Sequence, residues 1–225
     1  AVLALASIFS NTLMIGVPLV QLAYGEAALV NLFTLISMHA LVLLTLATIV
    51  LELLVAREEA AAGHAAPRHI AATVAQAVKN AVLHPVPLPI IAGFLYALTG
   101  LGLHPVVERP LKLLGDAFGP VALVLVGVTL AKTAIGRHLK DALVISFLKT
   151  VVHPLLMWAA GWALGLSGLP LKVMVVAAAL PVGANVFLFS QRYHKEEDLV
   201  TASVAVSTVM AVGTISVVMG LLAFV

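Results

Sequence analysis

The uncharged run VMVVAAALPVGANVFLFSQ, residues 173–191, decides the fold class, because it is long enough to cross a bilayer yet carries Pro181 and Gly183 near its centre. A membrane-spanning helix needs about 20 mostly apolar residues. Proline removes a backbone hydrogen bond from a helix, and glycine loosens the turn further. Inside lipid, the freed backbone groups need partners in protein, water or a bound solute. The run therefore predicts a broken membrane helix.

A second run of the same kind lies at the start of the chain. Residues 1–24 carry no charge, and their apolar sequence is interrupted at Gly16 and Pro18. Asn11 and Asn185 lie close to the two predicted breaks. In transporters, paired breaks near the bilayer midplane form the binding site, and the N-terminal ends of the half-helices face anionic groups. The pair therefore predicts a substrate site built from the two segments.

The chain as a whole is strongly apolar. Hydrophobic residues make up 62% of the 225 residues and charged residues 10%, with a mean hydropathy of +1.15. Soluble domains have about 45–50% apolar residues and about 25% charged residues. Uninterrupted apolar runs favour helices over the alternating segments of a barrel. We predict an all-α integral membrane protein, a helical bundle of about seven spans at residues 1–24, 27–51, 86–103, 111–131, 142–166, 173–191 and 199–225.

Several kinds of site are excluded by composition. The chain has no cysteine, so disulfides and thiolate metal sites are absent. The eight histidines lack zinc-ligand spacing, and no nucleotide-binding motif is present. A net charge of +2 is too small for a nucleic-acid surface. We expect no metal site, no cofactor and no nucleic-acid partner.

The distribution of Lys and Arg predicts orientation, because cytoplasmic loops are enriched in both. Placing the polar linker Arg57–His69 in the cytoplasm puts eight basic residues on that side and three on the other. Residues 70–84 then show a helical stripe of apolar residues, typical of a helix lying at the membrane interface. The eight are Arg57, Arg68, Lys79, Lys132, Arg137, Lys140, Arg192 and Lys195; the three are Arg109, Lys112 and Lys172.

Two ionisable residues share one face of the fifth span. Lys149 and His153 are one helical turn apart, and an ionisable residue inside a span is a functional candidate. Lys149 would attract a carboxylate, and His153 would carry a proton; the alternatives are that Lys149 snorkels to the interface and that His153 mends the kink at Pro154. His39 is expected to hydrogen-bond a neighbouring helix. The hydroxyl residues of the last span, Ser203, Ser207, Thr208 and Ser216, would be packing contacts or a polar wall beside Asn185.

Four motifs, in order along the chain, resemble those of the auxin efflux carrier family of plant and bacterial permeases. SNTLMIGVPL (residues 10–19) is similar to that family's fourth span, and KTVVHPL (149–155) to its eighth. LPVGAN (180–185), running on to Gln191-Arg192-Tyr193, resembles the ninth span, and AVST (205–208) the tenth. On this resemblance the seven spans correspond to the fourth to tenth of ten, so we expect an N-terminally incomplete chain.

The resemblance implies two inverted five-helix repeats, as in bile-acid sodium symporters, with a dimeric scaffold and a mobile transport domain that works as an elevator. Residues 1–55 would be the last two spans of the first repeat, and 136–225 three spans of the second, both in the transport domain. Residues 56–69 would be a cytoplasmic linker, and 70–135 the interfacial helix and two scaffold spans. Family substrates are carboxylates: auxin in plants, and malate- or malonate-like acids in bacteria.

These features predict a secondary carrier of a small organic anion in the cell membrane, in a homodimer, rather than an enzyme. The proton or Na⁺ would be the coupling ion, if one is used. Alternatives are a seven-helix receptor or a non-transporting fragment of a carrier; an intramembrane enzyme is disfavoured because the spans hold almost no acids. The expected substrate-binding residues are Asn11, Thr12, Gly16, Pro18, Lys149, His153, Pro181, Gly183 and Asn185.

Overall fold

A computed structural model describes residues 2–61, 75, 79, 87–132 and 138–224. Within these ranges the elements are helices joined by short turns, with a single isolated β-bridge between Ser10 and Val182. Most of the predicted interfacial helix, residues 70–84, and most of the predicted 56–69 linker lie outside the described residues. The all-α prediction is confirmed, and the first part of the predicted linker is the helical end of an element that runs on to Ala61.

The first broken span has its interruption earlier than the sequence predicts. Helix α1 (Val2–Ile8) ends before three non-helical residues, Phe9 to Asn11. The chain then turns through the π-helix η1 (Thr12–Gly16) into α2 (Val17–Tyr24). The predicted break at Gly16 and Pro18 is therefore wrong.

The position of Pro18 explains the difference. Pro18 lies in the first turn of α2, where a missing N–H leaves no hydrogen bond unmade. The preceding turn is one residue wider than an α-turn, since the Val17 N–H donates to the Thr12 carbonyl. A wide turn accommodates the proline ring without ending the helix. Pro18 therefore lies where η1 passes into α2, within a helical segment that it does not interrupt.

The second broken span matches its prediction. Helix α10 (Gly168–Ala179) ends at the non-helical residues 180–183, and α11 (Ala184–Tyr193) begins immediately after them. Pro181 and Gly183 both lie in this interruption. Their combined effect on the backbone is what the sequence predicts.

Three further spans are continuous. Helix α3 (Glu26–His39) passes through η2 (Ala40–Leu44) into α4 (Thr45–Ala61), and α8 (Leu139–Phe147) passes through η4 (Leu148–Val152) into α9 (His153–Ala163). The third is α12 (Glu197–Leu222). Within the described part of the chain, three helical stretches are long and apolar enough to cross a membrane: Glu26–Leu51, Leu139–Ala163 and Glu197–Leu222.

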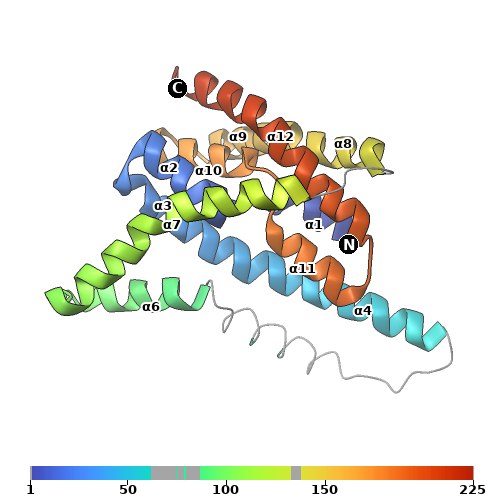
Figure 1. Cartoon of the computed structure of the whole chain (residues 1–225), viewed down its shortest axis with the longest axis horizontal. Helices are drawn as coiled ribbons and strands as arrows, with labels where there is room; N and C mark the ends of the chain where they lie inside the picture. Colours follow the sequence, from blue (N-terminus) through green and yellow to red (C-terminus); the bar gives the residue numbers. More distant parts are fainter. Residues whose placement is uncertain (1, 62–74, 76–78, 80–86, 133–137, 225) are drawn as a thin grey trace.

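The two remaining predicted spans correspond to α6 (Pro87–Leu98) and α7 (Pro105–Lys132). Helix α7 contains Pro110 and Pro120, and it changes direction along its length in Figure 1. Proline is the usual cause of a sharp kink. Helix α7 contacts η1 and α2, and α6 contacts α3.

Two apolar cores lie on either side of the broken segments. One joins α1 and α11 to α8 and the first half of α12, around Ala6, Val186 and Val200. The other joins α2 and α10 to α3 and the second half of α12, around Val20, Leu32 and Val176. Each broken span thus contributes one half-helix to each core, and residues of the interruptions belong to both cores: Phe9 and Val182 to the first, Leu180 to the second.

Candidate functional site

The two interruptions pair with each other through their backbones. Ser10 and Val182 form an antiparallel bridge. The Asn11 N–H donates to the Pro181 carbonyl at 2.9 Å, and the Gly183 N–H donates to the Phe9 carbonyl at 2.9 Å. Each interruption therefore supplies one donor and one acceptor to the other, which satisfies groups that lipid could not.

A hydroxyl of α12 satisfies one more group at this crossing. The Val182 N–H donates to Ser207 Oγ at 3.0 Å, and that hydroxyl donates to the Val204 carbonyl at 3.1 Å. Ser207 is fully buried. Ser207 thus makes a hydrogen-bonded contact with the second interruption, whereas the Ser203 hydroxyl donates within its own helix, to the Leu199 carbonyl.

We expect Ser207→Ala to weaken the crossing, because the buried Val182 N–H would lose its acceptor. An unsatisfied buried donor costs about 1–3 kcal/mol, so the apparent melting temperature of the detergent-solubilised protein should fall. Ser216→Ala is the matched control, since Ser216 is an exposed residue of α12 whose hydroxyl donates only within the helix. Equal melting temperatures for the two variants would contradict this role.

Close backbone approach explains the glycines at the crossing. A Cβ on Gly183 would lie 2.7 Å from a ring carbon of Phe9 and 2.9 Å from the Ser10 carbonyl oxygen. A Cβ on Gly16 would lie 2.8 Å from a methyl carbon of Leu180. The contact with the Ser10 carbonyl oxygen is with backbone and cannot be relieved by a rotamer change. Gly183 is therefore a requirement of the crossing itself.

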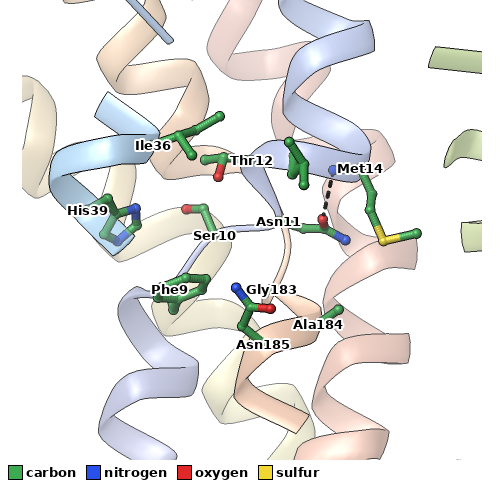
Figure 2. A pocket seen from close by; sticks show the side chains of 11 residues that line it. Phe9, Ser10, Asn11, Thr12, Met14, Ile36, His39, Gly183, Ala184 and Asn185 are labelled. Atoms are coloured by element: carbon green, nitrogen blue, oxygen red, sulfur yellow. Dashed lines mark hydrogen bonds between the residues drawn. The ribbon is translucent and has the colours of Figure 1, made fainter. Parts of the chain in front are cut away.

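A small cavity opens beside the paired backbones. Its volume is about 110 Å³, several times the ~10–15 Å³ that admits one water molecule. Figure 2 shows side chains from both broken spans, and from the end of α3, around it. The lining residues are Phe9, Ser10, Asn11, Thr12, Leu13, Met14, Ile36, His39, Gly183, Ala184 and Asn185.

Four of the nine predicted site residues line this cavity: Asn11, Thr12, Gly183 and Asn185. The other five have positions around it. Pro181 supplies a carbonyl to the crossing, and Gly16 and Pro18 lie further along η1 and α2. Lys149 and His153 lie on α8–α9 and face the end of α10. The structure thus separates the predicted set into cavity residues and supporting residues.

The two asparagines present amide groups at the cavity. Asn11 Oδ1 accepts from the Met14 N–H at 3.3 Å, which caps the N-terminus of η1 and leaves the amide Nδ2 donors for another partner (Figure 2). Asn185 is half-buried, and its side chain makes no hydrogen bond to any described residue. An amide NH₂ carries two donors. Both side chains can therefore donate to a bound acceptor.

Half-helix N-termini converge on the same place. The η1–α2 segment begins at Thr12, and α11 begins at Ala184 with Gly183 as an N-cap that offers no side chain. The first N–H groups of a helix have no intrahelical acceptor, and they carry a partial positive charge. The cavity accordingly has hydrogen-bond donors and positive potential, which suits an anion.

Lys149 is bound to protein rather than directed at the cavity. Its side chain is fully buried, and Nζ donates to the carbonyls of Ala178 at 2.6 Å and Leu180 at 2.7 Å. His153 Nδ1 lies 3.4 Å from Nζ and 3.2 Å from the Ala178 oxygen. The alternative in which Lys149 snorkels to the interface is wrong, because its partners are the carbonyl of Ala178 in α10 and that of Leu180 just after the helix. His153 joins the same cluster.

His39 lies between two cavities of the structure. The predicted hydrogen bond from His39 to a neighbouring helix is wrong: among the described residues it has no hydrogen-bond partner, and its ring instead stacks on Phe9 with centroids 4.9 Å apart. It lines both the small cavity and a larger apolar one of about 560 Å³, which His153 also lines. Ser10, whose buried hydroxyl has no partner in the described structure, lines both as well. The sequence feature that could have indicated a site at His39 is its position as an ionisable residue in the middle of a span.

Comparison with known proteins assigns the family. The family model described as "Membrane transport protein" matches residues 1–219. The chain belongs to this family. The membrane transport protein family comprises transporters rather than enzymes, and its match, together with the apolar helices, makes this chain a multi-pass, all-α membrane protein.

Two relatives of the chain refine this assignment. The chain is 29% identical over 215 residues to the "Putative malonate transporter" of Rhizobium meliloti (strain 1021), an alignment covering 94% of this chain and 63% of the relative. It is 22% identical over 245 residues to "Auxin efflux carrier component 8" of Arabidopsis thaliana, an alignment that covers 92% of this chain and 67% of that relative. The resemblance to auxin efflux carriers is confirmed. The chain spans less than two thirds of the length of the Rhizobium relative.

Proposed function

We propose that the protein is a secondary carrier that moves a small organic anion, such as a carboxylic acid, across the cell membrane. The observation that carries the proposal is the convergence of two asparagine amides and two half-helix N-termini on one small cavity. Donors fixed around a partly desolvated cavity favour an anion over a neutral solute. The names of the relatives, which mention malonate and auxin, support the same class of substrate.

The volume of the cavity favours a small acid. Cavities that take drug-sized ligands measure roughly 300–1,000 Å³, whereas this one measures about 110 Å³. A three- or four-carbon carboxylate matches that scale better than an acid bearing an indole ring. We therefore place malonate-like acids before auxin-like acids as substrates.

The mechanism that we propose is elevator-type alternating access in a homodimer. Residues 1–55 and 136–225 would move as the transport domain, since their helices share the two apolar cores that enclose the crossing. Residues 70–135 would form the scaffold, and residues 56–69 the cytoplasmic linker. Two cores joined through one crossing suit rigid-body motion, because packed cores move as units rather than deform continuously.

The proposal is tested by uptake into proteoliposomes that contain the full-length protein encoded by the gene. Radiolabelled malonate, malate and indole-3-acetate are compared with the uncharged malonamide. We expect saturable uptake of malonate or malate above empty liposomes, weaker uptake of indole-3-acetate and none of malonamide. Absence of uptake for every acid, or binding without transport, would overturn the carrier function.

A further inference from the structure

Lys149 lies at the point where the half-helix α10 ends. Its Nζ donates to the carbonyl of Ala178, in the last turn of α10, and to the carbonyl of Leu180, the first residue of the interruption. The helix leaves its final carbonyls without intrahelical donors. Lys149 comes from η4, a different span, and lies 29 and 31 residues away from these partners in sequence. The contact therefore exists only through tertiary structure.

The acceptors around the Lys149 ammonium are all uncharged. An ammonium has three donors. Two carbonyl oxygens accept from this one, and its third polar neighbour is His153 Nδ1 at 3.4 Å, an acceptor in the Nε2–H tautomer. No acidic side chain of the described residues lies within ion-pair distance of it. The negative counterpart is thus the C-terminal end of α10, which carries about half an elementary charge.

In carriers built on broken helices, unwound carbonyls and half-helix C-terminal ends coordinate the coupling cation. Here those carbonyls are already bound by an ammonium at 2.6 and 2.7 Å. We propose that Lys149 is a built-in cation that occupies this position, so that the anion is carried without cotransported Na⁺. A free cation cannot share both carbonyls with Nζ, because like charges at that separation repel strongly in a buried site.

This inference rests on the proposed function and selects between its coupling ions. Lys149 is a positioning residue, since it holds Leu180 next to the crossing and does not line the small cavity. His153 Nδ1 lies 3.4 Å from Nζ and 3.2 Å from the Ala178 carbonyl oxygen, so it accepts from Nζ in the Nε2–H tautomer and donates to that carbonyl in the Nδ1–H tautomer. The cluster fixes the end of α10 in the way that a bound Na⁺ would.

The first test replaces ions around the wild-type, full-length protein in proteoliposomes. We expect malonate uptake at equal rates in sodium, potassium and N-methylglucamine chloride at constant ionic strength. Uptake that requires Na⁺ would overturn the inference while leaving the carrier function intact. Failure of the carrier function itself would show as no uptake in any of the three salts.

The second test removes the ammonium. We expect Lys149→Ala to lower uptake in N-methylglucamine chloride by about tenfold or more, since two buried carbonyls lose their donor. Sodium or methylammonium chloride should then restore part of the activity, and Lys149→Arg should retain more activity than Lys149→Ala. Lys140→Ala, which removes an exposed charge from α8, is the matched control and should behave as wild type.

The second test also has results that would overturn the inference and results that would support it. Uptake by Lys149→Ala at the wild-type rate in every salt, or loss of uptake that neither cation restores in a protein that stays folded, would overturn the inference. If Lys149→Ala does not fold, Lys149→Arg decides instead. Uptake by Lys149→Arg that is independent of Na⁺ supports a built-in cation, and uptake that depends on Na⁺ overturns it.

Discussion

Replacement of Gly183 by alanine is expected to abolish transport and to lower the free energy of unfolding by roughly 3 kcal/mol. The added Cβ would meet the Phe9 ring at 2.7 Å and the Ser10 carbonyl oxygen at 2.9 Å. To relieve that overlap the two interruptions must separate, which breaks the bond from the Gly183 N–H to the Phe9 carbonyl. Uptake assays and thermal melting in detergent measure the two effects.

The control for this variant is Gly213→Ala. Gly213 lies within α12, and a Cβ there would have no neighbour within 4 Å in the described structure. Alanine is favoured over glycine in a helix by about 1 kcal/mol, so this variant should be as stable as the wild type or slightly more stable. Wild-type uptake by Gly183→Ala would show that the crossing tolerates the wider spacing, and would contradict the prediction.

Alanine in place of either cavity asparagine is expected to remove most substrate affinity. Hydrogen bonds to charged groups contribute about 1.5–3 kcal/mol each, so Asn11→Ala and Asn185→Ala should each raise the dissociation constant roughly 10- to 150-fold. Asn185→Asp should be worse than Asn185→Ala, because it places a negative charge where the anion binds. Asn11→Ala should also lower stability, since Asn11 Oδ1 caps the Met14 N–H.

Equilibrium binding of labelled malonate to the purified protein measures these losses without requiring turnover. Asn31→Ala is the control, because Asn31 is a half-buried residue of α3 that lines neither cavity. Unchanged affinity in both Asn11→Ala and Asn185→Ala would place the anion site elsewhere. An increase in affinity for Asn185→Asp would exclude an anionic substrate at this position.

The sequence predicts the second interruption correctly but not the first, because only the second contains residues that break a helix. In the second span, Pro181 and Gly183 lie at the break itself, so local backbone preferences and the structure agree. In the first span, Pro18 lies in the first turn of α2, where η1 passes into it without a break, and the break lies at Phe9–Asn11, which contains neither proline nor glycine. That break is held by the crossing, through Asn11 capping and the bond to Pro181, and a single segment does not display such contacts.

The roles of side chains are likewise predicted where they depend on local sequence and missed where they depend on tertiary contacts. Asn11 and Asn185 were found because polar amides are rare in apolar spans and lie next to the breaks. Lys149 was selected for the same reason, but its partners lie on another helix, and sequence spacing gives no indication of which carbonyls it reaches. The sequence predicts a packing role for His39, whereas its place beside two cavities comes with its stacking on Phe9, a tertiary contact.

The reciprocal pairing of the two interruptions has a consequence for biosynthesis. Ser10 and Val182 are about 170 residues apart in the chain. At about 5–20 residues per second, the ribosome needs roughly 10–30 s to supply the second partner after the first has been made. During that time the amide and carbonyls of the first interruption are without their final partners. The nascent segment must be held in a hydrated or protein-lined part of the insertion machinery until its counterpart arrives.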